Sequence, residues 1–336
     1  MISLDAFLEQ GNEIRSIIRQ LADGQMVHAL MISGEKGLGK RTLATLIAAG
    51  LLCRNDNRRP CGKCNICRAV MELEHPDLTV IRKGEPIAPD VAKGRATIPV
   101  DDIREMIRIS GERTLEGGVR VFMIFDADKM TPQAQNSLLK TLEEPPENTH
   151  IILVTDHAEN LLTTVHSRCR TIRLHPWTKD YVFQVLQEHG IEESRARNAA
   201  SDAMGSIGKA LELASNDDYW DMRKKVIQQF FNTGNRSDII RYSNEWKDRK
   251  ADADQLYDIL EMMIRHLLQF RLLGDAGRDM NEFPEDWKNW ARKADLSRFT
   301  YLTEAVHTAR MENMANVNFQ ASVEQLLLVY MGERTK

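Results

Sequence analysis

The sequence predicts an α/β protein that begins with a mostly parallel sheet covered by helices on both faces and ends in helices alone. Three observations lead to this fold class. Short apolar runs alternate with amphipathic helical patterns through about residue 172, as in parallel sheets. A glycine-rich loop of the phosphate-binding type follows the first of these runs. Beyond residue 216 the apolar residues follow helical stripes only.

Length and composition limit the classes of protein that the chain can belong to. With 336 residues it exceeds one average domain, so two or three domains are expected. A net charge of −4 gives no overall attraction to nucleic acid, and no Lys/Arg run marks a local basic surface. The sequence contains neither an apolar stretch of about 18 residues nor an N-terminal signal pattern. We therefore expect a cytoplasmic protein without a membrane partner.

The glycine-rich loop lies between a predicted strand and a predicted helix, which is the context that a phosphate site requires. The strand is expected at 28–32 and the helix at 41–52, and the pattern G-x-x-x-x-G-K is carried by Gly34, Gly37, Gly39 and Lys40. Backbone N–H groups of such a turn face an anion, and the ammonium of Lys40 would reach the terminal phosphates. The alternative is a glycine turn that binds no ligand.

Arg41 stands where a working nucleotide hydrolase has the Ser or Thr that holds magnesium. Magnesium requires hard oxygen ligands, whereas a guanidinium offers only donors and a positive charge. Thr42 comes one residue too late, because one step along a helix turns a side chain by about 100°. ATP binding thus stays open, whereas ATP hydrolysis by this chain is not expected.

Four of the five cysteines form a second motif with the spacing C-x7-C-x2-C-x2-C: Cys53, Cys61, Cys64 and Cys67. In a reducing compartment such clustering favours a metal over disulfides, and four thiolates complete a closed tetrahedral zinc site of the structural kind. An iron–sulfur centre would need a further cysteine soon after Cys67. His75 could replace Cys53 as a ligand, and unliganded thiols are the remaining alternative.

The middle of the chain continues the alternation of strands and helices. An exposed loop is expected between two strands at 83–98, a buried strand at 119–125, a helix from about 131, and another strand at 151–156. Ligands bind at the carboxyl edge of a parallel sheet, where Asp126 and Thr155 would join the glycine loop. Alternatively, Asp126 and Asp128 cap the helix that follows them.

The remaining residues read as helices. A small helical lid is expected from Thr171 to about Ser215, with Gly205 and Gly208 marking the ends of its last helices. Long amphipathic helices follow, and four of the five tryptophans lie among them as core or interface residues.

Together these motifs resemble the clamp-loader branch of the AAA+ ATPases, in bacteria the loader of DNA polymerase III. The segments that carry the resemblance are 34–40, the cysteine motif, Leu138–Pro146, Ser167–Cys169 and Gly205–Ala210. The resemblance implies an AAA+ P-loop domain with a parallel sheet and a zinc-binding insertion, then a small helical lid domain and an all-α C-terminal collar domain. The implied boundaries are 1–172 with the zinc module at 53–67, 173–215, and 216–336.

The resemblance also implies that the acidic pair of the motor subunits is incomplete here. Registered on Leu138–Pro146, that pair falls on Phe125 and Asp126, so the metal-binding acid is lost. Shifting the register by one residue puts Ala127 on the base that activates water. Either register removes one acid from a reaction that depends on positioning and charge.

Arg168 is implied to be an arginine finger that reaches the ATP of a neighbouring subunit. From the residues alone, a surface ion pair would be the more ordinary role for such an arginine. The implied partners are the gamma/tau and delta subunits in a hetero-pentamer, the sliding clamp, and primed DNA contacted through phosphates.

Two other functions stay open at this point. The chain could be an ATP-hydrolysing motor subunit of the same loader, which would need an intact magnesium site. It could also be a zinc-bearing nucleic-acid-binding regulator, against which the acidic net charge argues.

Overall fold

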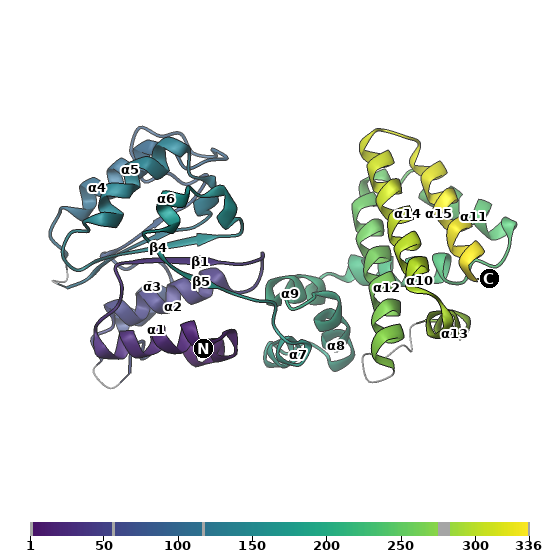
Figure 1. Cartoon of the computed structure of the whole chain (residues 1–336), viewed down its shortest axis with the longest axis horizontal. Helices are drawn as coiled ribbons and strands as arrows, with labels where there is room; N and C mark the ends of the chain where they lie inside the picture. The colour runs from purple at the N-terminus through teal and green to yellow at the C-terminus, as the bar shows by residue number, and fades with distance from the viewer. Residues whose placement is uncertain (1–2, 56–57, 116–117, 275–282, 335–336) are drawn as a thin grey trace. The chain divides into compact units, whose positions relative to one another are not determined.

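A computed structural model of the chain describes residues 3–55, 58–115, 118–274 and 283–334. The chain forms two compact units, Met1–Ala214 and Ser215–Lys336 (Figure 1). The predicted fold class is confirmed, because a parallel sheet with helices fills the first unit and the described residues of the second unit are helices and their connections. No helix in the described ranges is long and apolar enough to cross a bilayer.

The sheet of the first unit has five strands in the order β2-β3-β4-β1-β5, and all four pairings are parallel. The strands are β1 (Ala29–Ser33), β2 (Leu78–Ile81), β3 (Arg120–Ile124), β4 (Thr149–Thr155) and β5 (Arg170–Arg173). β1 and β3 are buried at every position, as expected of strands covered on both faces. β5 is a strand that the sequence pattern did not predict, because its four residues, Arg-Thr-Ile-Arg, include one apolar side chain and give a weak strand signal.

Helices cover both faces of this sheet (Figure 1). On one face lie α1 (Asn12–Asp23), α2 (Lys40–Leu52) and α3 (Asn65–Met71), and on the other α4 (Val100–Ser110), α5 (Pro132–Glu143) and α6 (Thr163–His166). Short 3₁₀ turns add η1 (Leu4–Gln10), η2 (Ala127–Lys129) and η3 (Ala158–Asn160). The loop predicted at 83–98 is largely exposed, but it leads from β2 into α4 and not directly into the next strand.

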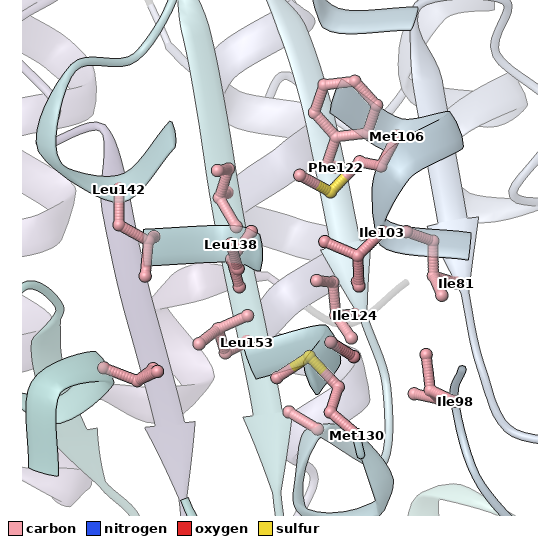
Figure 2. Close-up of a cluster of buried hydrophobic side chains, with 14 of the residues drawn as sticks. Ile81, Ile98, Ile103, Met106, Phe122, Ile124, Met130, Leu138, Leu142 and Leu153 are labelled. Carbon is pink, nitrogen blue, oxygen red and sulfur yellow. The ribbon is translucent and has the colours of Figure 1, made fainter. Parts of the chain in front are cut away.

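One hydrophobic core fills the space between the sheet and the helices α4 and α5. Figure 2 shows it, with Phe122 and Ile124 of β3 facing Ile103 and Met106 of α4 and Leu138 of α5. All five side chains are completely buried. This packing fixes α5 against the sheet, and both the end of α5 and the loops around it contribute to the sites described below.

Three further helices follow β5, namely α7 (Lys179–Glu188), α8 (Glu193–Asp202) and α9 (Ile207–Ser215), and the first unit ends one residue before the end of α9. They correspond in position to the predicted lid, although its separation as a domain stays a prediction.

The second unit consists of α10 (Asp217–Phe230), α11 (Arg236–Trp246), η4 (Lys250–Asp252), α12 (Ala253–Leu273), α13 (Glu285–Lys293), α14 (Leu296–Met314) and α15 (Phe319–Arg334). Its core is aromatic. The Phe231 ring makes edge-to-face contacts with Trp287 and Tyr330 at centroid distances of 4.9 and 5.3 Å. Trp246 and Trp287 are both fully buried, so these two tryptophans are core residues.

Candidate functional site

The glycine-rich loop connects β1 to α2 at the carboxyl edge of the sheet, as predicted. Gly37 and Gly39 have φ angles of 82° and 92°, a left-handed conformation that favours glycine. Gly39 is the residue that precedes α2, so the loop leads directly into a helix N-terminus. The backbone therefore has the form that a phosphate-binding turn requires.

Residues that follow β5 along the chain hydrogen-bond to the backbone of this loop. The backbone N–H of Gly208 donates to the Gly37 carbonyl at 2.9 Å, and the Ser206 hydroxyl donates to the Lys36 carbonyl at 3.1 Å. The Trp177 indole N–H donates to the carbonyl of Leu38 at 3.0 Å. A side chain on Gly37 would collide with the Ser206 hydroxyl, so this glycine is also needed for close approach. Gly208 is expected from the sequence to mark a helix end, whereas these contacts with the loop could not be predicted from it.

Lys40 is buried and already carries a counter-charge from the same chain. Its Nζ lies 2.7 Å from Oδ1 of Asp156, and it donates to the Glu35 carbonyl at 2.5 Å. Asp156 follows β4, which pairs with β1, so the topology brings the two residues to one edge. A phosphate would have to compete with a carboxylate for this ammonium. The sequence reasoning missed Asp156, although an acid directly after an apolar strand was a usable indication.

Arg41, Phe125 and Asp126 form one cluster. Nη2 of Arg41 donates to both carboxylate oxygens of Asp126, at 2.9 and 3.1 Å. The same guanidinium lies over the Phe125 ring, 5.1 Å from its centroid. Arg41 and Phe125, two of the departures from a working magnesium site, are therefore in contact with each other, and Arg41 also holds the acid that remains, Asp126. In either register of the motif, the remaining acid is engaged by a cation of this chain.

Asp128 has two other partners at the same edge. Its Oδ1 accepts from the Thr155 hydroxyl at 3.0 Å, and its Oδ2 lies 3.0 Å from Nζ of Lys129. Burial opposes ionisation of Asp128, but the hydrogen bonds from Lys129 and Thr155 outweigh it and lower its pKa. The capping alternative is wrong for α5, because the Thr131 hydroxyl accepts from the N–H of Ala134 at that helix N-terminus.

Arg168 lies just beyond α6 and remains partly exposed, at 31 % of its side chain. Its Nε donates to Oε1 of Glu143 at 2.7 Å, and Nη2 donates to the same oxygen. Nη1 donates to the Thr164 carbonyl at 2.9 Å and to the Ser167 hydroxyl at 3.3 Å. Within the single chain, Arg168 is thus a surface ion-pair partner, and Glu143 is a contact that the sequence analysis did not predict.

The four predicted cysteines meet in space. The sulfur atoms of Cys53, Cys61, Cys64 and Cys67 all lie within 4.8 Å of one another. Sulfurs at the corners of a zinc tetrahedron with bonds of about 2.3 Å are about 3.8 Å apart, and the Cys61 and Cys67 sulfurs are 3.9 Å apart. Because Cys64 is the residue before α3, its sulfur accepts from the N–H of Cys67 and holds the last two ligands in place.

The protonation of these thiols differs with their surroundings. Backbone N–H groups of Lys63 and Cys64 lower the pKa of Cys61 to about 6, whereas burial raises the pKa of Cys67. A bound cation would favour the thiolate at both positions. The donor set and its spacing fit a tetrahedral metal with soft ligands.

The other candidate ligands lie outside this group. His75 does not join it, and its Nδ1 instead accepts from the N–H of Asp77 at 3.1 Å. Cys169 lies elsewhere, and burial raises its pKa to about 12, which makes it an unreactive thiol.

The chain is similar to known proteins along most of its length. Residues 9–178 match the model of the family described as "DNA polymerase III, delta subunit". The chain is 26 % identical to DNA polymerase III subunit delta' of Bacillus subtilis, over 95 % of each chain. It is 33 % identical to subunit delta' of Escherichia coli, over 64 % of this chain and 63 % of that one. A solved structure of a gamma subunit-related protein from Thermotoga maritima covers 96 % of this chain and 100 % of its own, with a TM-score of 0.45 and 14 % identity.

Proposed function

We propose that this chain does not itself hydrolyse ATP. The premise is that the chain belongs to the DNA polymerase III delta-subunit family. Relatives named subunit delta' make it a clamp-loader subunit and a component of the DNA polymerase III holoenzyme. Within that loader it acts as the delta-prime subunit that splits no ATP and assists neighbours that do. The observation that carries the proposal is the pair of hydrogen bonds from the Arg41 guanidinium to the two carboxylate oxygens of Asp126.

The physical argument concerns magnesium. Phosphoryl transfer in P-loop enzymes relies on a metal held by a hydroxyl and an acid, and on a lysine that cradles the phosphates. In this chain a guanidinium replaces the hydroxyl and takes both oxygens of the acid, while the lysine is paired with Asp156. Gly34, Gly37, Gly39 and Lys40 therefore keep the shape of a nucleotide loop without its catalytic charges.

Arg168 is proposed to act in chemistry on the ATP of a neighbouring subunit. An arginine supplied in trans can stabilise the charge that grows on the transferred phosphoryl group, with rate effects of about 10³ to 10⁵ in GTPase systems. Its position supports this role, because it is partly exposed and lies just before β5, at the amino end of the last strand of the sheet. Cys53, Cys61, Cys64 and Cys67 would hold a structural zinc ion with no open coordination position.

The partners follow from the same family. We propose that the chain closes one end of a cytoplasmic hetero-pentamer with gamma/tau and delta subunits, through the collar helices of its second unit. The assembled loader would open the sliding clamp and place it on primed DNA. Relatives named gamma and tau, with 30 and 31 % identity, support an assembly of related subunits.

The test is reconstitution of the full chain with gamma-type ATPase subunits, delta and clamp. Arg168→Ala should lower ATP turnover of the complex by at least about 10-fold and impair clamp loading, since a finger acts on the transition state. Arg197→Ala, an exposed arginine paired within α8, is the matched control. Unchanged turnover with Arg168→Ala would refute the trans role. Brisk magnesium-dependent hydrolysis by the isolated chain, lost in Lys40→Ala, would identify a motor subunit instead.

A further inference from the structure

The segment Leu138–Pro146 is one of the most distinctive in the sequence, yet the proposed function assigns it no task. Its first residues form the end of α5, and Leu138 and Leu142 are buried in the core. Glu143 is the last residue of the helix and points out of this core, with 49 % of its side chain exposed. A cation at a helix C-terminus is favoured by the helix dipole, and Arg168 supplies that cation.

Glu143 takes one edge of the Arg168 guanidinium. Both Nε and Nη2 donate to its Oε1, while Nη1 donates to the Thr164 carbonyl on the other side. The group is thereby restrained from two directions. A guanidinium has five N–H donors, and the second N–H of Nη2 has no acceptor among the described residues. That donor remains available for an oxygen outside this chain.

A second residue of α5 fixes the segment that leads to Arg168. Gln135 is buried, its amide nitrogen donates to the Asn160 carbonyl at 3.4 Å, and its amide oxygen accepts from the N–H of Leu162 at 2.7 Å. Leu162 is the residue that precedes α6. Helix α5 therefore anchors the finger segment at its start through Gln135 and at its end through Glu143.

We propose that Glu143 is a positioning residue for Arg168. It holds the guanidinium by its Nε–Nη2 edge in one orientation, so that the remaining Nη2 donor meets a phosphoryl oxygen of the neighbouring subunit. This inference rests on the proposed function of Arg168. It gives the carboxylate a task other than a surface ion pair, which by itself contributes little to stability.

The experiment uses the reconstituted full-length complex and compares Glu143→Ala, Arg168→Ala and the double variant. Glu143→Ala should lower kcat for ATP by about 3- to 10-fold, because a misplaced charge loses transition-state contact, and should leave KM unchanged. Glu143→Gln, which keeps an oxygen acceptor, should recover part of the loss. In the Arg168→Ala background, removal of Glu143 should have no further effect.

The control is Glu144→Ala, which removes the same charge one residue further on, where the described residues show no ion pair. It should leave kcat unchanged, and thermal unfolding of every variant should match the wild type. If Arg168→Ala lowers turnover but Glu143→Ala does not, the positioning role is wrong and the finger stands. If Glu143→Ala raises turnover, or still lowers it without Arg168, the positioning role is also wrong. If Arg168→Ala has no effect, both proposals fail.

Discussion

At the scale of single residues, the glycine-rich loop differs from that of an active P-loop enzyme because its two cationic side chains form ion pairs within the chain. Lys40 and Arg41 are each paired with an aspartate that lies beyond the carboxyl end of another strand, Asp156 after β4 and Asp126 after β3. Neither pair is near in sequence, and both depend on parallel strands ending at the same edge. The loop is therefore neutralised by side chains of its own chain.

Removing the counter-charge of Lys40 should create an anion site. We expect Asp156→Ala to raise the affinity for ATP or inorganic triphosphate by about 5-fold, because a partly exposed ion pair contributes about 1 kcal/mol. Titration calorimetry without magnesium would measure the change. Asp90→Ala, an exposed acid in the loop between β2 and α4, is the control for net charge. Equal gains in both variants would mean that Asp156 does not compete with phosphate.

Restoring a hydroxyl at position 41 should return the metal dependence. In Arg41→Thr the carboxylate of Asp126 loses its guanidinium and the helix gains an oxygen ligand, so magnesium should strengthen ATP binding. The measurement is nucleotide affinity with magnesium and with EDTA. Arg41→Lys keeps a cation beside Asp126 and should show no magnesium effect. The interpretation fails if the threonine variant is as indifferent to magnesium as the wild type.

At the scale of elements, the four-cysteine module is a short insertion between α2 and β2, and α3 is the helix that its described residues form. Cys64→Ser should abolish stoichiometric zinc and loosen this segment, because a four-thiolate site contributes directly to folding. Metal analysis and hydrogen exchange of 61–71 would measure both effects. Cys169→Ser should keep its zinc. Acidification should also release zinc, since protons compete for the thiolates. Retention of zinc in the Cys64→Ser variant would exclude the four-cysteine site.

The core between the sheet and α4–α5 should dominate the stability of the first unit. Phe122→Ala removes a completely buried ring from β3 and should cost about 3–5 kcal/mol of unfolding free energy. Leu115→Ala changes a side chain that is 79 % exposed and should stay within about 0.5 kcal/mol of the wild type. Urea unfolding of the two variants provides the comparison. Similar losses in both would contradict the assignment of this core.

At the scale of the whole molecule, the second unit has a complete core of its own. Phe231, Trp287 and Tyr330 are fully buried within it. A fragment comprising residues 215–336 should therefore unfold cooperatively by itself, as judged by near-UV circular dichroism during heating. A fragment that shows secondary structure without fixed aromatic signals would indicate that this core needs the first unit.

The sequence predicts the parts of this molecule that depend on local pattern. The strand expected at 28–32 is β1 at Ala29–Ser33, and the helix expected from about 131 is α5 at Pro132–Glu143. Helix α4 was missed although Ile103 and Met106 have helical spacing. The cysteine group could be predicted because its ligands are close in sequence. The partners of Lys40, Arg41 and Arg168 could not, because they come from elements that are distant in the sequence and meet only in the folded chain.

The ion pair between Lys40 and Asp156 affects how this subunit would respond to the relative amounts of ATP and ADP. A pocket whose charges are balanced internally gains little from nucleotide, so its conformation should not follow the ATP/ADP ratio. In the proposed hetero-pentamer, whose ATP-splitting subunits would change conformation in each cycle, this chain would keep one conformation. Its conformation would not depend on bound nucleotide, and the other subunits would move relative to it.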